Sequence, residues 1–121
     1  MARRKYGPGV DAAAVLRLLD DREFVRYPVG VRFATDGLQK GEIAHAEPLG
    51  DHPKQGFCLF VHPGLESRRE DWAAVIAYHI PPVNYGDIAE PEDCEAFGAA
   101  LLGVDVESYY QRLCEIADSL H

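Results

Sequence analysis

The chain has 121 residues, of which 47% are hydrophobic, and it carries a formal net charge of −8 at pH 7. This apolar fraction excludes a disordered chain and favours one globular domain over residues 1–121. No apolar run approaches the roughly 20 residues of a membrane span, and three cysteines without a Cys-x-x-Cys spacing argue against a disulfide framework or a zinc knuckle. We therefore expect a cytoplasmic protein with reduced thiols and with no metal, cofactor or membrane partner.

The negative charge is concentrated in the last third of the chain. Residues 87–121 hold nine acidic side chains and one basic side chain, Arg112, whereas the first 86 residues hold eleven of each sign. This distribution disfavours polyanionic partners and leaves a protein with a basic surface as an open alternative. An acidic, solvated helix face explains the same charge without any partner.

A helix is predicted near the start of the chain. Residues 1–9 are basic and contain glycine, which is typical of a mobile arm. Asp11 is a suitable N-cap, and the leucines and valine that follow give a helix to about Arg22 one apolar side.

Three strands follow this helix. Apolar side chains alternate over residues 25–33, which indicates a half-buried strand, and Pro28 places it at a sheet edge. Residues 42–47 and 57–62 give the second and third strands. Because the connections are polar and a parallel pair needs a crossover of about a dozen residues, we expect an antiparallel β-meander. The third strand would then lie at an edge with both faces apolar, where either the C-terminal hairpin or a second subunit could cover it, and we favour a second subunit in a homodimer.

A helix after the third strand is predicted to pack on the sheet. Ser67 and Glu70 have the spacing of a capping box. Pro81-Pro82 is expected to end the helix and to make residues 82–87 a stiff, exposed turn. The apolar stripe of the helix consists of Trp72, Val75, Ile76, His79 and Ile80.

Two further helices form a predicted acidic hairpin. Pro91 suits a first helical turn, Gly103 suits a helix end, and Asp105 can cap a last helix to about Leu120. The facing side chains would be Cys94, Phe97 and Leu101 on one helix and Val106, Tyr110, Leu113 and Ala117 on the other. The fold class is therefore α+β: an N-terminal helix, a three-stranded antiparallel meander, one helix packed on the sheet, and an acidic helical hairpin.

Sets of side chains with known chemistry are incomplete in this chain. His45-Ala46-Glu47 occurs in zinc deaminases, but the Pro-Cys-x-x-Cys that completes their zinc site is missing. His62 and His79 fall at opposite ends of the predicted strand and helix, so they do not predict a metal site. Cys58 would approach His79, which makes these two weak catalytic candidates, although a histidine on an apolar stripe is more often part of the core.

The C-terminal hairpin has the outline of a helix-turn-helix. Its second helix begins with Asp105-Val106-Glu107, which would set two carboxylates against the phosphate backbone. We therefore expect an ordinary helical hairpin and no nucleic-acid partner.

Two classes of function stay open. A non-enzymatic protein-interaction or regulatory module is favoured, because no catalytic set is complete and the charge is concentrated in one third. The alternative is a small enzyme or ligand-binding protein with a site near His79, Tyr85 and Asp87. Contacts with a ligand or partner are predicted at Asn84, Tyr85, Asp87 and His62, and whether the protein is an enzyme stays undecided.

Overall fold

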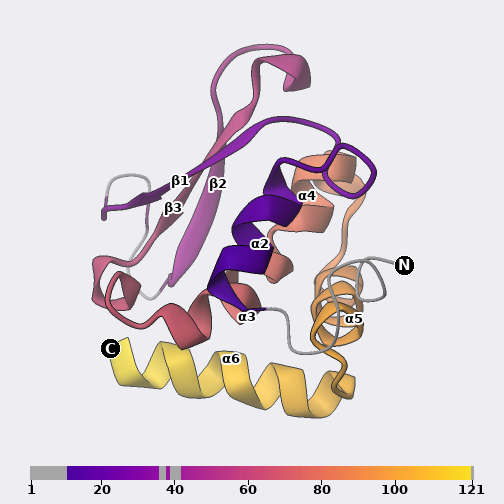
Figure 1. The fold of residues 1–121 in the computed structure, drawn as a ribbon. Coiled ribbons are helices and arrows are strands. Elements are labelled where there is room, and N and C mark those ends of the chain that lie inside the picture. The colour runs from indigo at the N-terminus through magenta and orange to yellow at the C-terminus, as the bar shows by residue number, and fades with distance from the viewer. Residues whose placement is uncertain (1–10, 36–37, 39–41, 121) are drawn as a thin grey trace.

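The fold is α+β, as predicted, with a three-stranded sheet and helices gathered on one side of it (Figure 1). The computed structural model describes residues 11–35, 38 and 42–120, so the predicted arm at residues 1–9 lies outside the described part. The principal elements are α2 (Ala12–Leu19), β1 (Val29–Phe33), β2 (Ala44–Pro48), β3 (Phe57–Val61), α3 (Trp72–Tyr78), α4 (Ile80–Tyr85), α5 (Pro91–Leu102) and α6 (Val106–Leu120).

The sheet is mixed and has the strand order β1-β3-β2. β3 runs parallel to β1, with Val29 opposite Phe57, and antiparallel to β2, with Ala44 opposite Val61. The predicted antiparallel meander is therefore wrong. Its error lay in considering each connection separately, because β2 and its two flanking loops together supply the crossover of more than about a dozen residues that a parallel pair needs.

The central position of β3 also changes the basis of the predicted homodimer. β1 is an edge strand, as Pro28 indicated, and the Pro28 carbonyl accepts a hydrogen bond from the N–H of Phe57 at 2.8 Å. β3 is paired on both sides, so it has no uncovered edge for a second subunit. The reason for expecting a dimer is wrong, and the dimer itself stays a prediction.

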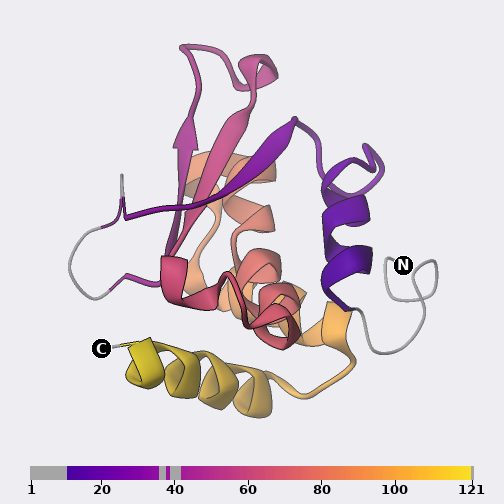
Figure 2. The same cartoon turned by 60° about the vertical axis from the view of Figure 1, so that its left-hand side comes forward.

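The core lies between the sheet and the helices (Figure 2). Leu59 and Val61 of β3 are almost fully buried, as are Val75 and Ile76 of α3. β1 has the predicted alternation, with half-buried positions separated by exposed ones. Among the described residues, no helix combines the length and the apolar character needed to cross a membrane.

The chain continues as a helix where an exposed turn was predicted. α3 ends at Tyr78, and Pro81-Pro82 lie in the first turn of α4, which runs to Tyr85. The prediction of a stiff turn over residues 82–87 is therefore wrong for most of that segment. The first N–H groups of a helix have no intrahelical partner, so prolines there remove no hydrogen bond. His79 is the junction residue between the two helices.

The helix ends show which capping predictions hold. Asp11 accepts the N–H of Ala14 at 2.8 Å, and Asp105 accepts the N–H of Ser108 at 2.8 Å, so both predicted N-caps are confirmed. Gly103 ends α5 in the left-handed conformation, with φ of 74°. The predicted capping box at Ser67 is wrong, because the short 3₁₀ helix before α3 begins after Arg68 and has no side-chain cap.

The buried face of α6 is rotated by about one residue from the predicted face. Tyr109 and Ile116 are buried, whereas Tyr110 is 53% exposed. Tyr109 fits against Gly98 of α5, where any Cβ would overlap the tyrosine ring. The Tyr109 hydroxyl also donates to the carbonyl of Ala74 at 2.5 Å, which fixes α6 to α3 as well as to α5.

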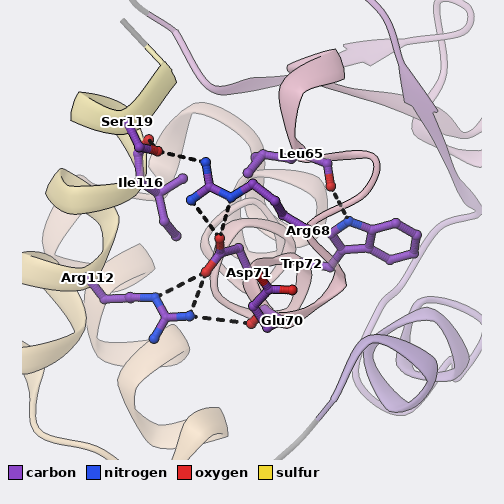
Figure 3. A network of polar contacts seen from close by, with 8 residues as sticks. All are labelled: Leu65, Arg68, Glu70, Asp71, Trp72, Arg112, Ile116 and Ser119. Carbon is purple, nitrogen blue, oxygen red and sulfur yellow. Dashed lines mark hydrogen bonds and ion pairs between the residues drawn. The ribbon is translucent and has the colours of Figure 1, made fainter.

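An ion cluster around the buried carboxylate of Asp71 holds the far part of α6 (Figure 3). Asp71, which is 4% exposed, accepts hydrogen bonds through one carboxylate oxygen from Arg68 at 3.0 Å and 2.8 Å. Its other oxygen accepts from Arg112 of α6 at 3.2 Å and 2.5 Å. Arg68 also donates to the hydroxyl of Ser119 at 2.7 Å. Residues before α3 are thus tied to two turns of α6.

Candidate functional site

A pocket of about 350 Å³ lies between α3, α6 and the residues that lead into β2. We call it the His79 pocket. It has apolar and polar side chains in equal number, and several of the polar ones are aromatic or heteroaromatic. The apolar residues are Ile43, Ala44, Val75, Leu113 and Ala117, and the polar residues are Glu42, Tyr78, His79, Tyr110 and Cys114.

Two helices position the polar side chains of this pocket. Tyr78 ends α3 and His79 follows it, with the two rings edge to face and their centroids 5.4 Å apart. On α6, Tyr110 and Cys114 are four residues apart and therefore share one helix face. Tyr110, Leu113 and Ala117 were predicted to contact α5, and they line the pocket instead.

His79 is neutral at physiological pH. Burial lowers the pKa of its imidazole from the usual 6.5 to about 4, and the charge of nearby His45 lowers it further in the same direction. A neutral imidazole presents one hydrogen-bond donor and one acceptor. His79 can therefore orient a ligand by hydrogen bonds without adding a positive charge to the pocket.

The tyrosines of the pocket also stay protonated. Burial raises the pKa of Tyr78, and the charges of Cys94 and Glu95 raise it further. A hydrogen bond between the side chains of Tyr110 and Cys114 raises the pKa of the Tyr110 hydroxyl. Both hydroxyls are therefore uncharged groups that can donate and accept hydrogen bonds.

The predicted residues of α4 lie outside this pocket. The side-chain amide of Asn84 donates to the carbonyl of Phe24 at 2.7 Å and accepts the N–H of Arg26 at 2.8 Å. These bonds give Asn84 a structural role in holding the segment before β1. Tyr85 is 54% exposed and lines a different pocket, and the guanidinium of Arg26 lies 5.0 Å from its ring centroid.

The other predicted site residues are dispersed. Cys58 lies within β3, opposite Gly30 on one side and Glu47 on the other. His62 accepts the N–H of Gly64 at 3.0 Å and so caps the short 3₁₀ helix that follows β3. Neither residue lines the His79 pocket, so the predicted pair of Cys58 and His79 does not share this site. The side chain of Asp87 lies outside the described part of the chain.

Sequence reasoning identified His79 and missed its neighbours in the pocket. The spacing of Tyr110, Leu113 and Ala117 does mark a helix face, but the pattern does not say which element that face meets. Glu42 and Cys114 carry no local signal of a site. Their proximity to His79 depends on how α6 lies relative to β2.

Within the described part of the chain, no three histidine, cysteine or acidic side chains are grouped so that they could hold a metal ion. No protein-family model, curated protein or solved structure matches this chain.

Proposed function

We propose that this protein binds a small, mainly apolar ring compound that is uncharged at neutral pH, in the His79 pocket. The observation that carries this proposal is one concave site in which Tyr78, His79 and Tyr110 supply hydrogen-bonding groups beside apolar walls. Small-molecule sites commonly combine an apolar lining with a few polar groups that orient the ligand. The volume of about 350 Å³ lies near the lower end of the usual range for such sites, which favours a compact ligand.

The charges around the pocket favour a neutral ligand over an anion. None of the described residues that line it is a lysine or an arginine. Glu95 contributes to the raised pKa values of both Tyr78 and Tyr110, so its negative charge acts on these side chains. A carboxylate or phosphate would enter this pocket without a cationic partner among its described lining residues and against the negative charge of Glu95.

The pKa of His79 favours binding over acid–base catalysis. A general base works best when its pKa is close to the working pH, because a much weaker base provides little driving force for proton transfer. With a pKa of about 4, His79 is too weak a base for this task at pH 7. A hydrogen-bonding role for the imidazole agrees better with that value.

The proposal includes a reducing compartment such as the cytoplasm. Cys58, Cys94 and Cys114 are all free thiols, and Cys114 is exposed at the pocket. Free exposed thiols are typical of reducing compartments. A homodimer, if it forms through strand pairing, would have to use the outer side of β1 or β2, which are the edge strands.

A series of probes with one ring and three charges tests this proposal. Benzamide, benzoate and benzamidine have similar size and differ mainly in charge. We expect benzamide to shift the NMR signals of residues in the His79 pocket with a Kd of about 1 mM, as suits a ligand of so few atoms. Benzoate should bind at least about tenfold more weakly, because none of the described lining residues is a lysine or arginine that could meet its carboxylate. Equal binding of benzoate, or shifts confined to another surface, would contradict the proposal.

Two exposed tyrosines provide a matched pair of variants. Tyr110 lines the His79 pocket and is 53% exposed, whereas Tyr85 lies elsewhere and is 54% exposed. Tyr110→Ala should weaken benzamide binding at least about fivefold, the effect of losing roughly 1 kcal/mol of contacts. Tyr85→Ala should leave it unchanged. If both variants weaken binding equally, the ring is not held in this pocket.

A further inference from the structure

A second hollow, of about 330 Å³, lies where α4 meets α5, and we call it the α4–α5 pocket. Its lining is almost entirely apolar or aromatic and consists of Pro81, Tyr85, Ile88, Ala89, Asp93 and Phe97. Tyr85 is 54% exposed and Ile88 is 81% exposed. Single exposed apolar side chains are common, but two large ones bordering one apolar hollow form the kind of patch that marks an interaction surface.

The polar groups of this pocket are poorly suited to orienting a small molecule. Asp93 is the one charged residue among the described residues of its lining, and a carboxylate oxygen of Asp93 accepts the N–H of Glu90 at 2.9 Å as part of the capping box of α5. Sites for small ligands usually contain several convergent polar groups that fix the ligand. The described polar groups of this hollow are the Tyr85 hydroxyl and an Asp93 carboxylate that already accepts a hydrogen bond, so the hollow is better suited to an apolar side chain of a larger partner.

The negative charge beside the hollow favours a partner that carries positive charge. Glu90, Glu92 and Asp93 follow one another closely at the start of α5, and all three are exposed. No ion pair among the described residues neutralises them. The positive end of the α5 dipole offsets only about half an elementary charge. A partner with lysine or arginine next to its apolar side chain would meet complementary charge here.

We propose that the α4–α5 pocket docks a segment of another protein in which one apolar side chain is flanked by lysine or arginine residues. The apolar side chain enters the hollow between Tyr85, Ile88 and Phe97, and the basic side chains lie over the first turn of α5. Arg26, which already covers one face of the Tyr85 ring, confines the partner's basic groups to the α5 side. This surface is separate from the His79 pocket, since the two share no lining residue.

The test uses a short synthetic peptide with one central leucine between two pairs of lysines. Two matched peptides replace the lysines by glutamates or the leucine by glycine. We expect the lysine–leucine peptide to shift the NMR signals of Tyr85, Ile88 and Phe97, and its affinity to fall about fivefold or more between about 0.05 and 0.5 M NaCl, as screened charges require. Equal binding of the glutamate peptide would overturn the charge argument, and equal binding of the glycine peptide would show an acidic patch without a docking hollow.

Variants of the protein test whether the peptide binds at the α4–α5 pocket. Ile88→Ser should weaken the lysine–leucine peptide at least about fivefold, whereas Val104→Ser, at the other end of α5 and 46% exposed, should not change its affinity. Glu92→Gln removes one charge without touching the capping box and should weaken binding about twofold. If Val104→Ser weakens binding as much as Ile88→Ser, the proposal is overturned. Tyr110→Ala should leave the peptide unaffected, so failure of this surface and failure of the His79 pocket give different results.

Discussion

Asp71 and His79 lie at opposite ends of α3. Each places an ionisable side chain in a buried setting, and the two side chains are accommodated there in different ways. Asp71 is buried, and Arg68 and Arg112 donate hydrogen bonds to both of its carboxylate oxygens. Burial, with a smaller contribution from nearby His45, lowers the pKa of His79 to about 4, so its imidazole is neutral. A polar group whose hydrogen bonds are all made within the chain is part of the structure, whereas a neutral group at the wall of a hollow keeps capacity for a ligand.

The largest effect should come from removing the carboxylate of Asp71. Asp71→Ala leaves two arginines without their shared partner at the junction with α6, and we expect the free energy of unfolding to fall by about 3 kcal/mol. Urea denaturation measures this change. Glu70→Ala provides a matched control, because it removes the same charge from the neighbouring exposed position and should cost within about 0.5 kcal/mol. Equal losses in the two variants would show that the Asp71 cluster is not a structural tie.

The pH dependence of the free energy of unfolding should reveal the contribution of His79. Its folded pKa of about 4 lies below the unfolded value of 6.5, so the unfolded state takes up the proton first as the pH falls. The stabilisation is complete above pH 6.5 and is lost between pH 6.5 and about 4, by up to roughly 3 kcal/mol. His79→Gln should lack this loss, which urea titrations at a series of pH values would reveal as a shrinking difference between parent and variant.

His45 offers an internal check on the pH prediction. Its positive charge opposes protonation of His79, so His45→Gln should move the acid end of the window to higher pH. An unchanged window would mean that burial alone sets the pKa of His79. A parent and a His79→Gln variant with parallel pH profiles would contradict the depressed pKa itself.

Asn84 and Tyr85, which are neighbours on α4, extend the comparison between a structural side chain and one at a pocket. The expected difference in stability is smaller here. Asn84→Ala removes two hydrogen bonds to the backbone around residues 24–26 and should cost about 1–3 kcal/mol. Tyr85→Ala removes an exposed ring and should stay within about 0.5 kcal/mol. Thermal denaturation of the two variants measures the difference. If Tyr85→Ala is the more damaging change, Tyr85 serves structure and the α4–α5 pocket loses its main wall.

Predictions that depend on a few consecutive residues agreed with the structure more often than predictions of pairing between distant segments. The caps at Asp11, Gly103 and Asp105 involve only a few consecutive residues, so their chemistry is visible in the sequence. The strand order depends on pairing between segments far apart, and the polar connections did not indicate that β3 would lie between β1 and β2.

Dependence on contacts between distant segments also explains why only part of the candidate site was predicted. His79 is conspicuous as a polar residue on an apolar stripe, and it does line a pocket. The fit of the Tyr109 ring against Gly98 helps to set the rotation of α6 at which Tyr110 and Cys114 line that pocket. No spacing in either helix reveals this fit, since it concerns one glycine and one tyrosine on different elements.

The strand order has a consequence for the sequence of events in folding. β2 and β3 can form a hairpin by closing the short connection over residues 49–56, whereas β1 reaches β3 across residues 34–56. The longer loop costs about 1 kcal/mol more in chain entropy. During synthesis, neither outer strand has its partner until residue 61 has been made. We therefore expect β3 to organise the sheet late, β1 to join after the hairpin, and β1 to be the strand that detaches most readily while the hairpin remains intact.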